Sequence, residues 1–251
     1  MSADGWPVGV GRIVLPSVDS TNAEAFRRAP EQSGPVWILA GEQTAGRGRR
    51  ARPWSSPRGN FYATLLLFPT EAPATVALRS FAASLALRDA LEQATGSGAG
   101  LALKWPNDVL MNGGKVAGIL LESQGGGQGV SALAIGIGVN LIAHPDPAQV
   151  EPNALRPVSV LAETGIRVTP EAFLELLAVA YSRWEHRFQA HGFAALRDVW
   201  LSHAARLGEP ITARTGVMER SGIFETIDTD GNLVLKTGGS SVAIPAAEVF
   251  F

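Results

Sequence analysis

The sequence contains no cysteine, and this absence excludes several kinds of chemistry at once. Without thiols the chain can form no disulfide, offer no thiolate nucleophile and build no zinc–sulfur site. Its four histidines never show the spacing of an HExxH motif, so we expect no histidine-based metal site. A chain without cysteine fits the reducing environment of the cytoplasm, and we expect a cytoplasmic protein.

An excess of charge and long apolar runs are also missing. The 21 basic and 23 acidic side chains nearly cancel, which leaves a formal charge of −2 and no general electrostatic attraction to nucleic acid. No apolar run approaches the ~20 residues that a membrane-spanning helix needs. The N-terminal residues show neither a basic leader nor a following apolar core, which argues against a secretory signal. We therefore expect neither a DNA partner nor a membrane.

The composition is that of a folded protein with a sizeable core, because hydrophobic residues make up 46% of the 251 residues and charged residues 18%. Apolar spacing predicts four helices, over 23–29, 75–94, 170–190 and 193–203. It also predicts five strands, over 36–40, 61–68, 101–105, 115–122 and 131–139. Segments rich in glycine and proline are expected to be loops or turns, at 46–59, 112–114, 125–127 and 143–157.

From about Leu207 the sequence changes to short β runs. These cover 211–214, 222–228, 233–236 and 242–244. Asp230-Gly231 between two of them is typical of a tight turn. The sequence thus predicts an α+β fold. A mixed or antiparallel sheet flanked by helices would occupy residues 1–205, and a small β barrel or sheet would occupy residues 206–251.

The segment 43–54 contains the sequence GRGRR and is the most informative part of the chain. Five of the eighteen arginines lie between Arg47 and Arg58. Guanidinium groups suit phosphate and carboxylate, and interleaved glycines let a backbone close around an anion. A Rossmann phosphate turn is excluded, because Pro53 stands close to where its helix should begin. We favour an anion-binding loop that folds over a ligand. A solvated basic loop and a nucleic-acid patch, in which Trp54 would stack on bases, stay open as alternatives.

The second motif is KWPND, which is followed by GGKVAG. Two of the three lysines in the chain, Lys104 and Lys115, lie in this window. A lysine ammonium at a strand end can neutralise a carboxylate or a phosphate during acyl transfer. Two surface lysines beside a hairpin are the plain alternative. A P-loop is excluded, because Val109 and Val116 stand where that motif requires Gly and Ser or Thr.

The third motif is Gly136-Ile137-Gly138-Val139-Asn140. Glycines inside an apolar strand leave room for the close approach of a ligand, and the Asn140 amide can present a donor and an acceptor to a base edge. A bulged core strand would explain the glycines equally well. The chain has no GxSxG elbow and no Cys–His pair, so it offers no candidate nucleophile.

Taken together and in this order, the motifs resemble those of biotin protein ligases. The matching segments are Asp19-Ser20-Thr21-Asn22, GRGRR with Trp54, SPRGNFY, KWPND, GGKVAGIL and GIGVN. The resemblance is strong from Asp19 to about Asn140, and the tail is similar to the SH3-like C-terminal domain of that family. Only about eighteen residues precede Asp19, too few for the winged helix-turn-helix of the regulatory members. The chain therefore resembles the non-regulatory class.

This resemblance implies an ATP-dependent enzyme that works with Mg²⁺. It would activate biotin as biotinyl-5′-adenylate, release pyrophosphate, and then transfer biotin to one lysine of a biotin carboxyl carrier domain. Both half-reactions bring anionic oxygens together, so fixed cations and backbone donors should supply most of the catalysis. The acyl acceptor would be a lysine of the partner, which accounts for the missing nucleophile. The expected oligomeric state is a monomer or a weak homodimer.

The resemblance also implies roles for individual residues. Hydrogen bonds to biotin would come from Ser20, Thr21, Asn22 and Gln43. The loop that orders over biotin and the adenylate would include Arg47, Gly48 and Arg49. Lys104 would contact the reacting carboxylate and the α-phosphate, and it would be catalytic together with Arg49. Binding of the nucleotide would involve Arg49, Arg52, Trp54, Lys104, Lys115 and Asn140. Among these, Arg52 would face the pyrophosphate and Asn140 the adenine.

Two positions depart from the family pattern. Ala51 and Pro53 stand where related loops often have Gly and Lys-like residues. The aromatic side chain that commonly covers adenine has no clear match in 143–161, where Val160 or Leu161 would take its place. A lipoate ligase of the same fold and a non-catalytic RNA-binding module that uses the arginine loop are the alternatives. The combination of GRGRR with KWPND is closer to the biotin pattern.

Overall fold

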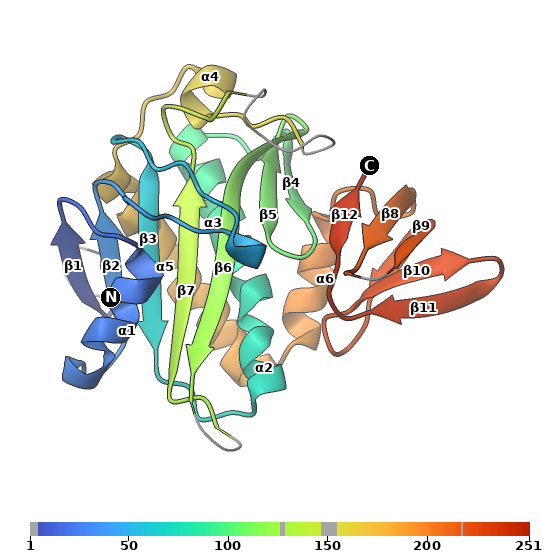
Figure 1. The fold of residues 1–251 in the computed structure, drawn as a ribbon, viewed down its shortest axis with the longest axis horizontal. Coiled ribbons are helices and arrows are strands. Elements are labelled where there is room, and N and C mark those ends of the chain that lie inside the picture. The colour runs from blue at the N-terminus through green and yellow to red at the C-terminus, as the bar shows by residue number, and fades with distance from the viewer. Residues whose placement is uncertain (1–4, 126–128, 147–154, 217) are drawn as a thin grey trace.

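A seven-stranded mixed sheet forms the centre of the protein (Figure 1). The computed structural model describes residues 5–125, 129–146, 155–216 and 218–251. The strands are β1 (Gly11–Leu15), β2 (Val36–Ala40), β3 (Phe61–Leu67), β4 (Leu101–Lys104), β5 (Asp108–Met111), β6 (Gly114–Gln124) and β7 (Ala132–Val139). Their order is β1-β2-β3-β7-β6-β5-β4, in which only β1 and β2 are parallel. The predicted mixed sheet is thus confirmed.

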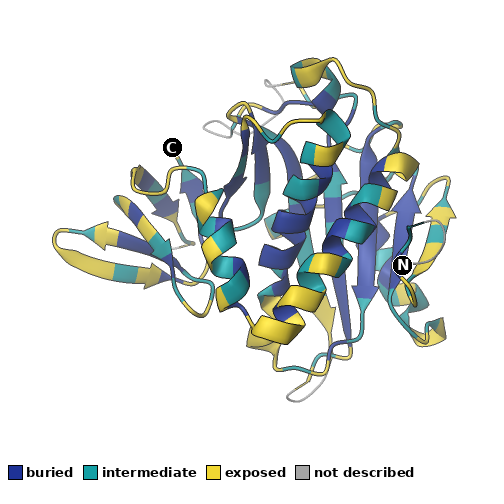
Figure 2. Ribbon diagram, turned by 180° about the vertical axis from the view of Figure 1, so that it is seen from behind, coloured by how far each residue is buried: buried dark blue, intermediate teal, exposed yellow. Residues whose placement is uncertain are grey.

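Helices cover one face of this sheet almost completely. In the described residues the helices are α1 (Thr21–Arg28), α2 (Pro73–Ala77), α3 (Arg79–Thr95), α4 (Val160–Thr164), α5 (Pro170–His191) and α6 (Ala194–Ser202), and it is α3 and α5 that pack on the strands at this face. Figure 2 shows α3 and α5 side by side on the sheet, with buried residues inward and exposed residues outward. Phe61 of β3 packs edge-on against Phe173 of α5, with ring centroids 5.1 Å apart. The sheet–helix interface therefore holds the main core.

The opposite face carries only α1 among the helices (Figure 1). Beyond the end of α1, the segment between β2 and β3 crosses in front of β7 and β6. This segment includes the single 3-10 turn η2 (Arg49–Ala51) and otherwise has no regular element, as its glycines and prolines predict. A loop therefore covers the part of this sheet face that α1 does not, and the motifs predicted to bind ligands lie beside this loop.

The tail forms a second, five-stranded antiparallel sheet. Its strands are β8 (Pro210–Arg214), β9 (Glu219–Ile227), β10 (Leu233–Thr237), β11 (Ser240–Ile244) and β12 (Glu248–Phe250). The order is β11-β10-β9-β8-β12, so that in the described residues β11 and β12 are two free edges and the barrel is not closed. A small barrel or sheet was expected, and the described residues form the open sheet, because each edge strand has a ladder on one side only. The Trp105 indole donates to the carbonyl of Gly231 over 3.1 Å and joins this sheet to the main domain.

The structure corrects several element boundaries. The helix predicted over 75–94 is two helices, because i→i+3 bonds at Leu78 tighten the chain between α2 and α3. Strands β1, β5 and β12 and the short helix α4 were not predicted. Parts of the turns expected at 125–127 and 143–157 lie outside the described residues. Within the described ranges, no helix is long and apolar enough to cross a membrane.

Candidate ligand-binding site

A cavity of about 690 Å³ opens on the sheet face that the loop covers. It is bounded by the start of α1, the arginine loop, the adjoining ends of β4 to β7 and the strand β12 of the second sheet. All twelve residues that sequence reasoning selected for ligand binding line it: Ser20, Thr21, Asn22, Gln43, Arg47, Gly48, Arg49, Arg52, Trp54, Lys104, Lys115 and Asn140. Residues up to 120 positions apart are thereby brought into one site, while their individual roles stay predictions.

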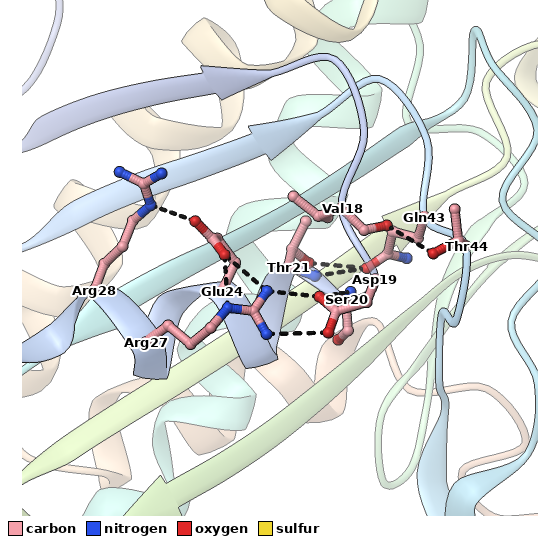
Figure 3. Close-up of polar contacts among 9 residues, drawn as sticks. All are labelled: Val18, Asp19, Ser20, Thr21, Glu24, Arg27, Arg28, Gln43 and Thr44. Carbon is pink, nitrogen blue, oxygen red and sulfur yellow. Dashed lines mark hydrogen bonds and ion pairs between the residues drawn. The ribbon is translucent and has the colours of Figure 1, made fainter.

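The turn before α1 is held by ion pairs on its outer side (Figure 3). Arg27 donates to both carboxylate oxygens of Asp19, over 2.6 and 3.0 Å. Hydrogen bonds from Arg27 and from the backbone N–H of Ser20 lower the pKa of Asp19 to about 2. Glu24 accepts further bonds from Arg27 and Arg28. These ion pairs hold the outer side of the turn, and the neutral polar residues that follow Asp19 line the cavity.

Gln43 connects the start of α1 to the loop. Its Oε1 accepts from the backbone N–H and the hydroxyl of Thr21, over 2.9 and 3.1 Å (Figure 3). Its Nε2 donates to Ser56 Oγ over 3.1 Å, and Ser56 donates onward to the carbonyl of Trp54. Both lone pairs of Oε1 are therefore used within the described residues, and one amide N–H of Gln43 is left for a ligand.

Asn22 is the most enclosed of the polar residues at this end, with 3% of its surface exposed. Its Nδ2 donates to Glu122 Oε2 over 2.8 Å and to the carbonyl of Leu120 over 3.2 Å. Its Oδ1 accepts from Thr64 Oγ1 over 2.6 Å. Gly136 makes this approach possible, since a Cβ there would lie 2.4 Å from Asn22 Oδ1. The first glycine of GIGVN thus admits a side chain of the protein.

The arginine loop is a short hairpin. Trp54 N donates to the carbonyl of Gly46 over 2.9 Å, and Gly48 N donates to the carbonyl of Arg52 over 2.8 Å. Arg50 and Ala51 at its tip have φ values of 56° and 57°, in the left-handed region that costs about 1–2 kcal/mol for a residue with a Cβ. Two residues that carry a Cβ therefore place strain at the tip of the loop.

Trp54 lies on the sheet where two strands lack side chains. Gly118 of β6 and Gly138 of β7 are cross-strand partners, and a Cβ on Gly138 would lie 2.7 Å from the indole. A Cβ on Gly118 would lie 3.3 Å from the indole. Lys115 Nζ lies 5.5 Å from the centre of the indole, within the range of a cation–π contact. The second glycine of GIGVN therefore provides the floor on which the loop tryptophan packs.

Lys104 and Lys115 share the carboxylate of Asp108. Lys115 Nζ lies 2.7 Å from Asp108 Oδ1, and Lys104 Nζ lies 3.9 Å from Oδ2. Lys104 is 9% exposed, and its burial lowers the pKa of its ammonium. Asp108 opposes this decrease, whereas the positive charge of Lys115 adds to it. The motif KWPND thus contains a buried cation together with the carboxylate that keeps it charged.

The second sheet reaches the same cavity through β12 and its flanks. Glu248 accepts from Arg50 over 2.6 Å and from Arg52, and the bond from Arg52 is the main cause of its lowered pKa. Arg49 donates to the carbonyl of Ala247 over 3.3 Å, and its own pKa is lowered by burial. Three arginines of the loop are therefore attached to the C-terminal sheet.

Asn140 closes the far end of the cavity. It is 4% exposed, and its Nδ2 donates to the carbonyl of Val158 over 3.0 Å. Val160 and Leu161, the positions suggested for covering adenine, are not among the described residues that line the cavity; they begin α4, and their backbone N–H groups donate to the carbonyls of Asn140 and Leu141. Leu155 and Pro157 line it instead.

Comparison with protein-family models is decisive. The model of the biotin/lipoate A/B protein ligase family matches residues 14–140, and that of the biotin protein ligase C-terminal domain matches residues 207–251. The chain belongs to the biotin/lipoate A/B protein ligase family.

Relatives within this ligase family agree over nearly the whole chain. A biotin–[acetyl-CoA-carboxylase] ligase of Paracoccus denitrificans is 58% identical over 238 residues, which cover 95% of this chain and 99% of that protein. The bifunctional ligase/repressor BirA of Bacillus subtilis is 31% identical over 94% of this chain and 71% of its own length. The structure of a biotin protein ligase from Aquifex aeolicus in complex with biotin and ATP is 27% identical, with a TM-score of 0.80 over 95% of this chain and 97% of the other.

Sequence reasoning missed the acidic partners of this ligase site. Asp108 belongs to KWPND but was given no role; the β4–β5 hairpin brings it to Lys104, and the pairing of β5 with β6 brings it to Lys115. Glu122 and Glu248 lie in segments without a local motif, and only the sheet pairing brings them to the site. The excess of arginine in the loop is the signal that could have pointed to acidic partners elsewhere in the chain.

Proposed function

We propose that this protein is a biotin protein ligase. It would use ATP to convert biotin to biotinyl-5′-adenylate, with release of pyrophosphate, and then transfer biotin to the acceptor lysine of a biotin carboxyl carrier domain. One observation carries the proposal: a single cavity contains a neutral, hydrogen-bonding end beside α1 and a cationic end built from the loop arginines and two lysines. The 58% identical Paracoccus ligase supports the same conclusion.

The neutral end fits a cyclic urea. Such a ring has one carbonyl that needs donors and two N–H groups that need acceptors. Gln43 retains one amide N–H, and the Ser20 hydroxyl can donate to the same oxygen. Thr21 Oγ1, whose proton goes to Gln43, and Asn22 Oδ1, which accepts only from Thr64, each retain an acceptor lone pair. The bicyclic ring of biotin contains this group.

The dithiolane ring of lipoate offers neither a carbonyl nor an N–H. If lipoate were bound, the polar groups of Ser20, Asn22 and Gln43 would lose water without gaining a partner. Sites built for hydrogen-bonding ligands reject analogues that lack the bonding group by about 10⁴–10⁵. The neutral end therefore favours biotin over lipoate.

The cationic end suits both chemical steps. In the first, a carboxylate oxygen of biotin attacks the α-phosphorus of ATP and pyrophosphate leaves; in the second, a lysine amine attacks the acyl carbon and AMP leaves. Lys104 would stabilise the charge on the oxygens shared by both steps, and Arg49 and Arg52 would neutralise the leaving phosphates. Trp54 on its glycine floor would help to exclude water from the mixed anhydride.

Mg²⁺ would enter with the nucleotide. The described residues contain no group of three or more metal-binding side chains. Asp108 and Glu248 line the cavity, but both are already paired with cations. Mg²⁺ commonly takes one or two carboxylates and completes its shell with substrate phosphates and water. We therefore assign its binding mainly to the ATP phosphates, with Asp108 as the carboxylate within reach of them.

Partner and organisation follow from the same proposal. The acceptor would be the biotin carboxyl carrier domain of a carboxylase, because the Paracoccus relative is named for acetyl-CoA carboxylase. Residues 1–205 would form the catalytic domain and residues 206–251 the SH3-like domain. We further propose a cytoplasmic enzyme that acts as a monomer or a weak homodimer and neither binds DNA specifically nor associates with membranes.

Exchange of labelled pyrophosphate into ATP tests the proposal directly. We expect exchange that depends on biotin and Mg²⁺ and is absent with lipoate, because only biotin satisfies the neutral end. Lipoate-dependent exchange would move the protein to the lipoate branch of the family. RNA binding that weakens with salt, in a protein without exchange, would instead favour a non-catalytic RNA-binding module.

A further inference from the structure

Glu122 of β6 lies outside every motif that pointed to the function, yet it contacts the most enclosed polar residue of the neutral end. Its Oε2 accepts from Asn22 Nδ2 over 2.8 Å, while its Oε1 lies 3.7 Å from an Arg47 guanidinium nitrogen. The side chain of Glu122 is 35% exposed, in contrast to the buried amide that it contacts. One carboxylate therefore connects the start of α1 to the arginine loop.

The contacts around Asn22 fix the direction of its amide. An asparagine side chain has two donor protons and two acceptor lone pairs. Both protons are used, one by Glu122 and one by the carbonyl of Leu120, and one lone pair is used by Thr64. The remaining lone pair of Oδ1 is the only capacity left. Asn22 is thus restricted to accepting a hydrogen bond from a ligand.

Of the two strong contacts that set this direction, Glu122 is the ionised one. A carboxylate accepts but never donates, so it selects the Nδ2 side of the amide. Thr64 has a hydroxyl that could donate or accept and would tolerate either orientation. Without Glu122, the carbonyl of Leu120 alone would discriminate between the two orientations of the Asn22 side-chain amide.

We propose that Glu122 is a positioning residue for recognition of the biotin ureido ring and acts through Asn22. It holds the Asn22 amide with Oδ1 toward the ring, so that a ureido N–H meets an acceptor. This inference rests on the proposed function. The ion pair with Arg47 is a separate contact; it is half-exposed on the arginine side, and pairs of this kind contribute little to stability.

Titration calorimetry of biotin with two variants tests the proposal. Glu122→Leu removes the acceptor, and we expect the Kd for biotin to rise about 10-fold, as for one misaligned hydrogen bond. Glu122→Gln keeps an acceptor oxygen at the same reach. The carbonyl of Leu120 still holds Asn22 Nδ2 in the parent orientation, so this oxygen can accept in place of the carboxylate, and the Kd should remain within about 3-fold of the parent. The KM for ATP should not change in either variant. If Glu122→Gln binds as weakly as Glu122→Leu, the charge rather than the hydrogen bond acts, and the proposal is wrong.

Glu42→Leu is the matched control. Glu42 has a similar exposure, 34%, and pairs with Arg58 of the same loop over 2.8 Å, but it does not contact Asn22. Its loss reports the effect of a missing loop ion pair, and biotin affinity should stay at the parent value. An increase in Kd equal to that of Glu122→Leu would overturn the proposal.

A double-mutant cycle separates positioning from general structural damage. If Glu122 acts through Asn22, the variant Asn22→Ala/Glu122→Leu should bind biotin no more weakly than Asn22→Ala alone. Additive losses would contradict the proposal. The parent protein is measured first with biotin and with lipoate. A parent that binds lipoate alone refutes the proposed function, whereas a parent that binds biotin with unresponsive variants refutes only the role of Glu122.

Discussion

The two ends of the cavity are built in different ways. At the neutral end, Thr21, Asn22 and Gln43 are fixed by hydrogen bonds to one another and to the sheet, and carry no charge themselves. At the cationic end, Arg52 and Lys115 are held by the carboxylates Glu248 and Asp108. The first end matches a ligand whose shape is constant. The second end must give up or share its carboxylates when phosphates arrive.

This difference separates binding from rate. Preorganised neutral groups interact equally with substrate and transition state, so their loss should mainly weaken biotin binding. Cations that meet developing charge act in the transition state, so their loss should mainly slow the chemical step. Variants at the two ends should therefore differ in whether they weaken biotin binding or slow the chemical step, and the largest change is expected at the cationic end.

Replacement of Lys104 by Ala should give the largest change. Loss of a charge-stabilising donor at a reacting centre typically lowers the rate by about 10²–10³. We expect this decrease in single-turnover formation of biotinyl-adenylate, with biotin affinity within about 3-fold of the parent. Lys104→Arg should not rescue the rate, because a planar fork does not replace a compact ammonium. Lys236→Ala, in the exposed part of β10, is the control and should be neutral. A parent-like rate for Lys104→Ala would remove the contrast between the two ends.

The sequence reveals only part of the difference between the neutral end and the cationic end. GRGRR, KWPND and GIGVN each lie within one segment, so their residues could be selected before the fold was known. The carboxylates that balance them could not, because Glu248 meets Arg52 across 196 positions and no local pattern links the two. The charged end is therefore visible in sequence as an excess of cations, and in the structure Asp108 and Glu248 offset part of that charge.

The limits of local sequence patterns also explain why some strands were not predicted. Strand β5 has four residues between a proline turn and Asn112-Gly113, too short for a period to be detected. Strand β1 is an edge strand whose residues are mostly exposed, so it lacks the apolar run that revealed β2. Long buried elements were predicted within a few residues, since their burial dictates their composition.

The pH dependence of the rate should distinguish the two neighbours of Lys104. If Lys104 acts as a cation, as we propose, the rate should fall as the pH rises through its pKa. Asp108 raises this pKa and Lys115 lowers it. Asp108→Asn should therefore move the alkaline decrease to lower pH, and Lys115→Ala should move it to higher pH. Single-turnover rates from about pH 6 to about pH 10, which bracket a lowered lysine pKa, measure both shifts. Shifts in the same direction in both variants would contradict this electrostatic account.

Glu248→Gln tests whether the cationic end is held by its carboxylate. The variant weakens the contacts of Arg50 and Arg52 with β12, so the ligand-free loop should open more often. Exposed ion pairs contribute up to about 1 kcal/mol each, and hydrogen exchange over residues 45–56 should accelerate by about 3- to 10-fold. Biotin and MgATP should remove most of this difference, because phosphates take the place of the carboxylate. Unchanged exchange without ligand would show that the Glu248 contacts do not hold the loop.

The smallest effect is expected at the tip of the loop. Ala51→Gly removes the strain of a left-handed alanine, about 1–2 kcal/mol, but increases the entropy of the unfolded chain by about 0.5–1 kcal/mol. The net stabilisation of about 0.5 kcal/mol should raise the Tm by about 1–2 °C. Ala99→Gly, at an exposed position outside the left-handed region, should slightly lower it. A lower Tm for Ala51→Gly would show that the loop depends on the stiffness that alanine gives.

The attachment of the arginine loop to β12 has a consequence during synthesis. All twelve predicted binding residues precede position 141, but Glu248 and the aromatic residues after it complete the wall of the cavity. A nascent chain on the ribosome therefore carries every ligand-binding motif well before the pocket can close. The contact between Glu248 and Arg50 can form only once β12 has paired with β8. The pairing of β12 with β8 thus completes this wall of the cavity after all twelve predicted binding residues have been made.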